Sequence, residues 1–285
     1  MANRFRLPGS ADLADTAYWS ATEFGAGGAA APTTGDAVYI TRGNDALTTG
    51  NLNVELASLT IGAGFTGSLG SSGSSITVRC DSGTVLVAGS KAAQINIAGN
   101  GSQALAKVQV ETAGGAKVRL TAGTVTLVQR NSGVCDVTGN CVVTTFRGRE
   151  GSSIIEDNAT GVTTLVQTGT GHTVCRRDVT TCITDESARV EIDRDAAVTT
   201  AQIGGTAVLN YHSSGTLGTL NQYGGVFDPS NAVVNVTVTT ANRYGGRYYS
   251  KVGGISAVPG SDPDVSNLGT LTAIAPLSSS LSRNI

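Results

Sequence analysis

A four-residue pattern of apolar and polar positions recurs through the second half of the chain. Each copy starts with Val or Leu, continues with Thr or Gly, and ends on a second apolar residue. Successive copies start 19, 17, 19, 19 and 21 residues apart. The six copies are VTTF (143–146), VTTL (162–165), VTTC (179–182), VTTA (198–201), LGTL (217–220) and VTTA (238–241).

The spacing of these copies predicts the fold class. Propeller blades need about 40 to 50 residues and helical repeats about 33 to 47, and the Leu/Asn framework of leucine-rich repeats is missing. A period of about 18 residues is instead typical of a β-solenoid, in which each coil of backbone stacks on the previous coil. We therefore predict an all-β, right-handed parallel β-helix with a single strand per coil and about 18 residues per coil. A β-sandwich is the alternative.

The motif itself indicates how the coils would stack. Alternate residues of a strand face opposite sides, so Val162 and Thr164 are expected on one face and Thr163 and Leu165 on the other. Stacking in register would align the first residues in an apolar ladder and the second residues in a polar ladder. The apolar ladder comprises Val143, Val162, Val179, Val198, Leu217 and Val238. The polar ladder comprises Thr144, Thr163, Thr180, Thr199 and Thr239.

Weaker copies extend the predicted solenoid upstream, so that its body spans residues 36–250. Three short strand-like segments follow one another at nine- or ten-residue spacing, and two of them would fill one coil. AKVQV and AKVRL are a further pair of near-copies. These segments are SITVRC (75–80), TVLVAG (84–89), QINIAG (94–99), AKVQV (106–110) and AKVRL (116–120).

Both ends of the chain lack the repeat. A solenoid exposes strand edges at its ends, so terminal segments are expected to cap it. Residues 1–35 hold the only Trp together with several other aromatic residues, and we predict an N-terminal arm or cap. Residues 251–285 are rich in Ser and contain three of the six prolines, which predicts an extended tail that orders only against a partner. The candidate partner-docking residues are Phe5, Arg6, Tyr18, Trp19, Phe24, Tyr248 and Tyr249.

A second local repeat lies near the end of the body. NQYGG (221–225) and NRYGG (242–246) are copies 21 residues apart, so Tyr223 and Tyr244 are expected to stack on consecutive coils. They either cover a corner of the solenoid or form part of a contact surface, for which Tyr is a common anchor.

The amino-acid composition of the chain argues against some classes of binding partner. Charged residues make up 14% of the chain, against roughly 25% in typical soluble domains. The net charge is −2, and there is no long basic or acidic block, so neither nucleic acid nor an anionic membrane is an expected partner. No apolar run is long enough to span a membrane, and no signal segment is recognisable at the N-terminus. We therefore expect the chain to be made in a cytoplasm, or to reach its destination without a classical secretion signal.

The cysteines are expected to be structural. Cys80, Cys135, Cys141, Cys175 and Cys182 are odd in number, which argues against a disulfide framework. Their spacing does not match a zinc site, so we predict small buried apolar side chains, with no metal and no cofactor.

The acidic residues raise the possibility of catalysis. Glu156, Asp157, Asp178, Asp185, Glu186, Glu191, Asp193 and Asp195 fall on successive predicted coils. A glycosidase needs two carboxylates about 5 to 9.5 Å apart, which neighbouring coils could supply. Arginines are interspersed among these acids, however, and we predict a solvated surface or an interface, with no catalytic residues. His172 and His212 lie 40 residues apart without metal-ligand spacing and are expected at the surface.

The segment AYWSATEFGAGGAAAPTTGDAVYI (17–40) resembles the N-terminal region of tailed-bacteriophage virion proteins. The matching features are Trp19-Ser20, the Gly/Ala run 25–31, Pro32-Thr33 and Asp36, followed by the strand-like Val38-Tyr39-Ile40. The resemblance implies a virion structural protein with a β-solenoid body, commonly a homotrimer. It implies no enzymatic activity and no cofactor.

From this resemblance we expect a capsid decoration (cement) protein that binds the major capsid protein on the outside of the head. Two alternatives stay open. One is a receptor-binding tail fibre or spike module. The other is a carbohydrate-active β-helix enzyme, whose activity would depend on Glu191 or Asp193.

Overall fold

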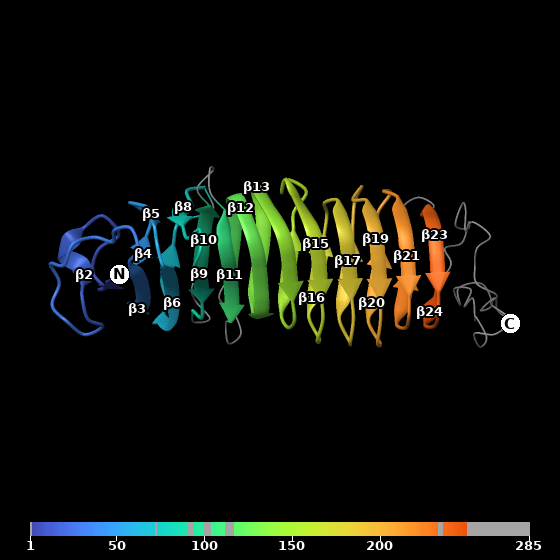
Figure 1. The fold of residues 1–285 in the computed structure, drawn as a ribbon, viewed down its shortest axis with the longest axis horizontal. Helices are drawn as coiled ribbons and strands as arrows, with labels where there is room; N and C mark the ends of the chain where they lie inside the picture. The colour runs from blue at the N-terminus through green and yellow to red at the C-terminus, as the bar shows by residue number, and fades with distance from the viewer. Residues whose placement is uncertain are drawn as a thin grey trace, which may run out of the picture. The chain divides into compact units, whose positions relative to one another are not determined.

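The computed structural model describes residues 2–71, 73–89, 94–99, 104–111, 117–232 and 236–249. Over these residues the chain is all-β, and its parallel strands stack into a β-solenoid, which confirms the predicted fold class (Figure 1). The chain divides into two compact units, residues 1–164 and 165–285. The predicted tail, 251–285, lies outside the described residues.

The first unit contains one short 3-10 helix, Thr16–Tyr18, and the strands up to β15, which continues into the second unit. Its strands are β1 (Asn3–Arg6), β2 (Trp19–Ser20), β3 (Ala37–Gly43), β4 (Ala46–Leu47), β5 (Leu52–Glu55), β6 (Ser58–Phe65), β7 (Ser68–Leu69), β8 (Ile76–Arg79), β9 (Thr84–Val87), β10 (Gln94–Gly99), β11 (Leu105–Glu111), β12 (Lys117–Ser132), β13 (Val134–Gly148), β14 (Ser152–Ile155) and β15 (Gly161–Gln167).

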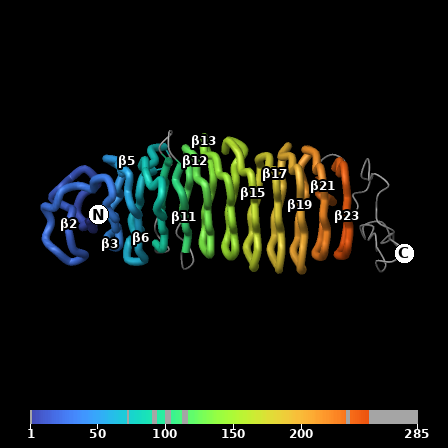
Figure 2. The backbone as a smooth tube through the Cα atoms, in the orientation of Figure 1, coloured from blue at the N-terminus to red at the C-terminus, as the bar shows by residue number. Residues whose placement is uncertain are grey.

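The second unit is built from short strands separated by turns, and in Figure 2 its backbone forms successive coils from β17 to β23. Its strands are β16 (His172–Cys175), β17 (Val179–Thr184), β18 (Arg189–Ile192), β19 (Val198–Ile203), β20 (Val208–Tyr211), β21 (Leu217–Gln222), β22 (Val226–Asp228), β23 (Val238–Arg243) and β24 (Arg247–Tyr248).

Most coils contain two strands, so the prediction of a single strand per coil was wrong for them, whereas β12 and β13 each run through most of a coil as one strand. In the second unit β16, β18, β20, β22 and β24 pair in parallel in one series. Between them, β17, β19, β21 and β23 pair in a second series. The physical reason is that a strand buries its inward side chains only against another surface, and the second strand of the same coil supplies that surface.

The coil length is close to the prediction in the regular part of the chain and longer near the N-terminus. Lys117 pairs with Val134 and Val179 with Val198, which gives 17 and 19 residues per coil. Near the start, Ser58 pairs with Thr84, which gives 26. Insertions in turns are tolerated in a solenoid because they leave the strand register unchanged.

The first residues of the repeated motif are buried and lie in register where pairing is described. In the second unit Val179, Val198, Leu217 and Val238 are successive partners. In the first unit Val143 pairs with Val125, and both Val143 and Val162 are buried. The second residues, Thr144, Thr163, Thr180, Thr199 and Thr239, are all exposed.

The expectation that successive residues of the motif point to opposite faces was wrong. Val162 and Leu165, the first and fourth residues, are both buried, whereas Thr164 is only half-buried. The same order of burial recurs in β17, β19 and β23. The register passes from Val179↔Val198 directly to Thr181↔Thr200, so the motif bends around its second residue. The bend turns two apolar residues inward that a straight strand would place on opposite faces.

The near-copies AKVQV and AKVRL do not stack on each other. Val108 of the first segment pairs with Val128, whereas Val118 of the second pairs with Ile95. The two segments therefore belong to different strand series. The two segments have similar sequences because both bury alternate apolar residues, and not because they occupy equivalent positions in the coil.

The prediction that the cysteines are buried is confirmed. All five cysteines are buried and none forms a disulfide. Burial raises the pKa of the Cys141 and Cys182 thiols to about 12, because a thiolate is poorly solvated in an apolar interior. These side chains act as small core residues.

Candidate docking site

The N-terminal segment is a folded cap on the first coil. β1 pairs in parallel with β3, with Asn3 opposite Ala37 and Phe5 opposite Tyr39. On its other side β1 pairs antiparallel with β2. Phe5 also stacks on Tyr39, with ring centroids 4.7 Å apart. The segment is therefore part of the solenoid body and not an extended arm.

Arg6 organises the interior of this cap. Its guanidinium donates hydrogen bonds to four backbone carbonyl groups at 2.9 to 3.1 Å, and only 3% of the residue is exposed. It also lies 5.2 Å from the ring centroid of Tyr18 and 5.7 Å from that of Trp19. Burial lowers the pKa of Arg6, although nearby carboxylates oppose the shift. The carbonyl acceptors belong to Leu7, Ser10, Asp12 and Tyr18.

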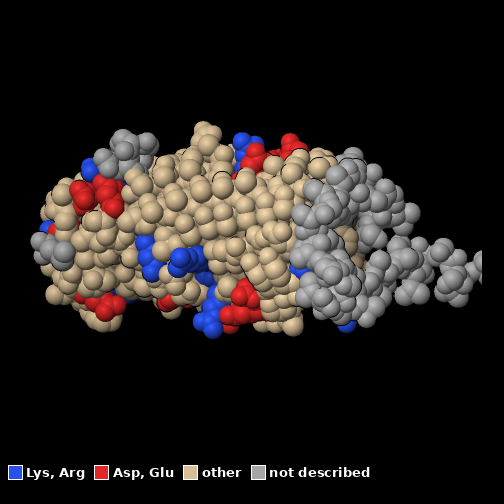
Figure 3. All heavy atoms as spheres, turned by 45° about the vertical axis from the view of Figure 1, so that its right-hand side comes forward, with Lys and Arg blue, Asp and Glu red and all other residues tan. Residues whose placement is uncertain are grey.

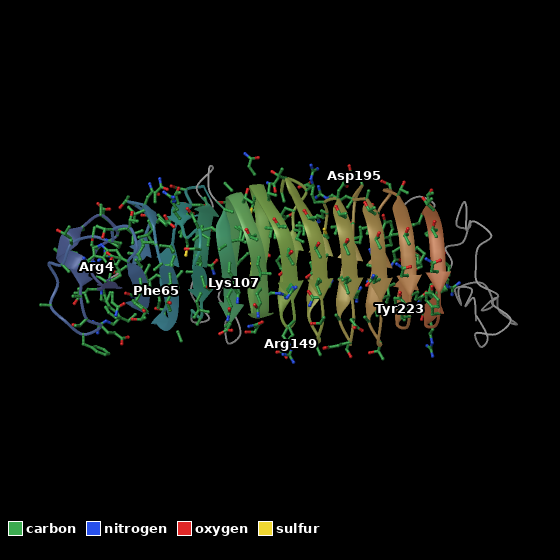
Figure 4. All side chains as sticks on the ribbon, in the orientation of Figure 1. Arg4, Phe65, Lys107, Arg149, Asp195 and Tyr223 are labelled. Carbon is green, nitrogen blue, oxygen red and sulfur yellow. The ribbon has the colours of Figure 1, made fainter. Side chains whose placement is uncertain are left out.

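Asp36 closes the turn that leads into β3. Its carboxylate accepts hydrogen bonds from the backbone N–H groups of Ala2 and Thr33, the Thr33 hydroxyl and the Arg4 guanidinium. Arg4, labelled in Figure 4, thus links β1 to this turn. Burial raises the pKa of Asp36, but the hydrogen bonds outweigh burial and lower it from 3.8 to about 2. The Pro-Thr-x-x-Asp segment, part of the sequence that resembles phage virion proteins, thus holds the turn before β3 through the bonds between Thr33 and Asp36.

We expect Asp36 to make the cap acid-sensitive. Because its folded pKa lies below its unfolded value, its contribution is present above about pH 4 and is lost as the pH falls toward about 2. The contribution is about 2 kcal/mol. Urea unfolding at pH 2 to 7, followed by the fluorescence of the single Trp, should show this loss. Asp36→Asn should be less stable at pH 7 and lack this part of the pH dependence. Parallel pH profiles for the two proteins would contradict the assignment.

Trp19 anchors a loop that extends from the cap. Its indole is fully buried and donates from Nε1 to the carbonyl of Leu13 at 2.8 Å. The N–H of Ala29 donates to the carbonyl of Trp19 at 2.9 Å, which closes the loop between them. Gly27 packs against the backbone of Ala17, where an added Cβ would lie 1.8 Å from the carbonyl oxygen. The close approach explains part of the Gly/Ala run.

Phe24 projects from this loop into solvent. It is 79% exposed, the highest value among the exposed large apolar side chains of the described residues. The Arg42 guanidinium lies 4.8 Å from the centroid of the Phe24 ring and donates to the carbonyl of Glu23 at 2.7 Å. Thr41 donates its hydroxyl to the Glu23 carboxylate at 3.2 Å. An exposed aromatic ring on a hydrogen-bonded loop is a candidate docking residue.

The structure separates the seven predicted docking residues into three groups. Arg6 and Trp19 are buried and stabilise the cap, so they cannot contact a partner without unfolding it. Phe5 and Tyr18 are half-buried in the same cap, and Phe24 is exposed. In the second unit, Tyr248 is half-buried and stacks on Phe227 at 5.4 Å, and Tyr249 is half-buried beside it in sequence.

A cluster of one carboxylate and two imidazole side chains in the second unit was not predicted from the sequence. Glu191 lies between two histidines, with Oε2 3.9 Å from His172 Nε2 and Oε1 3.4 Å from His212 Nδ1. The side chain of His212 is only 17% exposed, so the expectation of a surface position was wrong for this residue. Glu191 pairs with Val174 and Asn210 on the neighbouring coils. His172 and His212 each lie two positions from one of these partners, on the same face of the strand. The coil period was the signal that could have predicted the cluster.

The acidic residues considered for catalysis make structural contacts. Asp193 lies 3.4 Å from Arg176 and accepts a hydrogen bond from the backbone N–H of Arg194. Asp178 accepts from the N–H of Ala197. Within the described ranges, no group of three or more His, Cys, Asp and Glu side chains is arranged to hold a metal ion. On the face drawn in Figure 3, acidic and basic side chains lie in small mixed groups between wide uncharged areas.

None of the described residues belongs to a helix long and apolar enough to cross a membrane. No protein-family model, curated protein or solved structure matches the chain. The resemblance of residues 17–40 to phage virion proteins therefore stays a prediction from sequence.

Proposed function

We propose that the chain is a non-enzymatic decoration protein of a tailed-bacteriophage head, which binds the major capsid protein on the outside of the shell. The proposal is based on the cap loop, the segment between Trp19 and Ala29. In this loop the Phe24 side chain is 79% exposed, whereas Trp19 is fully buried. The loop is fixed by Arg42 and by the bond between Ala29 and Trp19. A fixed aromatic residue loses little side-chain entropy on binding and makes an effective anchor.

The solenoid supports this role as a rigid body. In the first unit the cap strand β1 pairs with β3, and β3 and β6 continue the stack, so the position of the cap on these coils is well defined. A protein that binds the assembled shell and not its free subunits stabilises the shell by mass action. Homotrimerisation is part of the proposal through the resemblance alone.

Binding to heads tests the proposal. The purified full chain is mixed with heads that lack it, and the bound protein is counted after sedimentation. We expect many copies in a fixed ratio to the major capsid protein. Phe24→Ala should weaken binding about 30-fold, as expected for an anchor residue worth about 2 kcal/mol. Tyr244→Ala, which removes another exposed aromatic ring, is the matched control and should bind normally.

Three results would count against the proposal. Absence of binding to heads would reject the decoration role. A handful of copies located at the tail would favour the fibre or spike alternative. Normal binding by Phe24→Ala would reject the cap loop as the docking site, provided that the variant melts at the same temperature as the wild type.

A further inference from the structure

One face of the second unit consists of two columns of uncharged side chains. The strands β17, β19, β21 and β23, which lie side by side in Figure 1, carry half-exposed outward residues between buried ones. The first outward column contains Thr181, Thr200, Thr219 and Thr240, which are successive partners in the parallel register. The second contains Ile183, Gln202, Asn221 and Asn242. We call these two columns the threonine face.

Charged residues of the same coils lie off this face. Arg243 ends β23, but it pairs with the buried Gln222 and so continues an inward column. Arg189 and Glu191 belong to β18, in the other strand series. Asp185 lies beyond the end of β17, at the corner, and is exposed. The threonine face is therefore an uncharged strip bordered by charged residues.

Two side-chain contacts hold the last two coils of the threonine face in place. The amide of Asn242 donates a hydrogen bond to that of Asn221 at 2.9 Å. Immediately after these strands, at the corner, Tyr223 and Tyr244 stack with ring centroids 5.1 Å apart and planes 7° from parallel, as predicted from sequence. A surface whose side chains are already fixed loses little conformational entropy when a partner binds.

We propose that the threonine face packs against the same face of other copies of the chain around a symmetry axis. The inference rests on the homotrimer that is part of the proposed function, and it locates the contact between the copies. A symmetric assembly brings equivalent residues together near its axis, so a charged side chain there meets its own copy and is repelled. An uncharged face avoids this repulsion.

The chemistry of the threonine face suits a partner with identical side chains. The hydroxyl group of Thr and the amide groups of Asn and Gln each both donate and accept hydrogen bonds. Two identical faces can therefore satisfy each other, whereas two faces of lysines or of carboxylates cannot. The methyl groups of the threonines and the side chain of Ile183 add apolar contact area.

The spacing of the coils is a second reason to expect a copy of the chain as the partner. Neighbouring strands lie about 4.8 Å apart, so each column repeats at this interval. A copy with a parallel axis presents the same interval, and one matched pair of coils brings the other pairs into contact as well. An unrelated protein would have to reproduce this repeat.

The mass of the protein in solution tests the inference. The full chain is measured by sedimentation equilibrium over a range of concentrations, and we expect a trimer. Thr200→Lys places a positive charge in the middle of the threonine face and should weaken association by about 100-fold or more, because like charges then meet. Thr216→Lys makes the same change at an exposed turn position and is the matched control, which should associate like the wild type.

Opposite charges provide a second measurement. Thr200→Glu should also weaken association, but an equimolar mixture of Thr200→Lys and Thr200→Glu should associate more strongly than either variant alone. High salt should partly restore the association of Thr200→Lys, because it screens the repulsion. Circular dichroism melting of each variant separates lost association from lost folding.

Three results would overturn the inference: a monomeric wild type, equal association of Thr200→Lys and Thr216→Lys, or no gain in the mixture of opposite charges. Head binding is scored separately. A wild-type chain that decorates heads as a monomer would overturn this inference and leave the docking of the cap intact. A trimer that binds no heads would reject the decoration role and leave the threonine face as the contact between copies, provided that the Thr200 variants behave as expected.

Discussion

Replacing Arg6 with methionine will loosen the N-terminal cap and lower its stability by about 3 kcal/mol. Methionine keeps the aliphatic stem of the side chain but donates no hydrogen bond, so four backbone carbonyl groups each lose one donor. The carbonyl groups of Asp12 and Tyr18 keep the bonds that they accept from the N–H groups of Asp15 and Leu7. The cation–π contacts with Tyr18 and Trp19 are lost as well. The loss arises from the four hydrogen bonds that are no longer made inside the cap rather than from the change in net charge.

Trp19 reports on this change directly because it is the only tryptophan and is fully buried in the cap. Urea unfolding followed by its fluorescence should show a lower midpoint and an earlier red shift for Arg6→Met. Arg147→Met is the matched control, since it makes the same chemical change at an exposed position and should alter stability by less than about 0.5 kcal/mol. Equal effects of the two substitutions would show that the carbonyl groups around Arg6 do not depend on it.

Replacing Tyr211 with alanine will destabilise the second unit by about 4 kcal/mol. The ring is fully buried and lies against Phe227, with centroids 6.2 Å apart. Its hydroxyl donates toward the carbonyl groups of Ala196 and Gly215 at 3.3 and 3.2 Å. Alanine would leave a cavity in a core that the neighbouring coils cannot fill, because their register is fixed by backbone hydrogen bonds. Circular dichroism in urea should measure the loss.

Two further variants separate the contributions of Tyr211. Tyr211→Phe removes only the hydroxyl and should cost about 1 kcal/mol. Tyr223→Ala removes a ring of the same kind from a position that is 59% exposed, and should cost well under half as much as Tyr211→Ala. A small effect of Tyr211→Ala would mean that the coils repack around the cavity.

The repeat predicted the fold because stacking imposes the same burial on each equivalent position. Val179, Val198, Leu217 and Val238 keep an apolar residue at the start of the motif, and this regularity is visible in the sequence alone. The other strand of each regular coil is visible in the sequence only as a short apolar segment, and it was not counted as a strand in the predicted fold class. HTVC, RVEI and VLNY share buried second and fourth residues but little identity, since any apolar side chain can fill such a position, as can Thr173 with its hydroxyl bonded to Gln167.

The candidate sites were harder to predict because they depend on polar groups inside the fold. Arg6 and Arg130 are both almost fully buried, which no hydrophobic pattern would suggest. Burial lowers the pKa of Arg130 to about 10, and the residue paired with it in the next coil is Gly148, which leaves room for its long side chain. The cap loop was found through its aromatic residues, but the sequence could not separate buried Trp19 from exposed Phe24.

The outermost strand of the cap runs against the direction of all the parallel strands that follow it. β2 is two residues long and antiparallel to β1, whereas β1 is parallel to β3. A second molecule that tried to add its own coils at this edge would meet a strand of the wrong polarity and of minimal length. The cap therefore prevents the solenoid from templating head-to-tail growth into a cross-β fibril from this end, and a variant with an unfolded cap should be prone to such polymerisation.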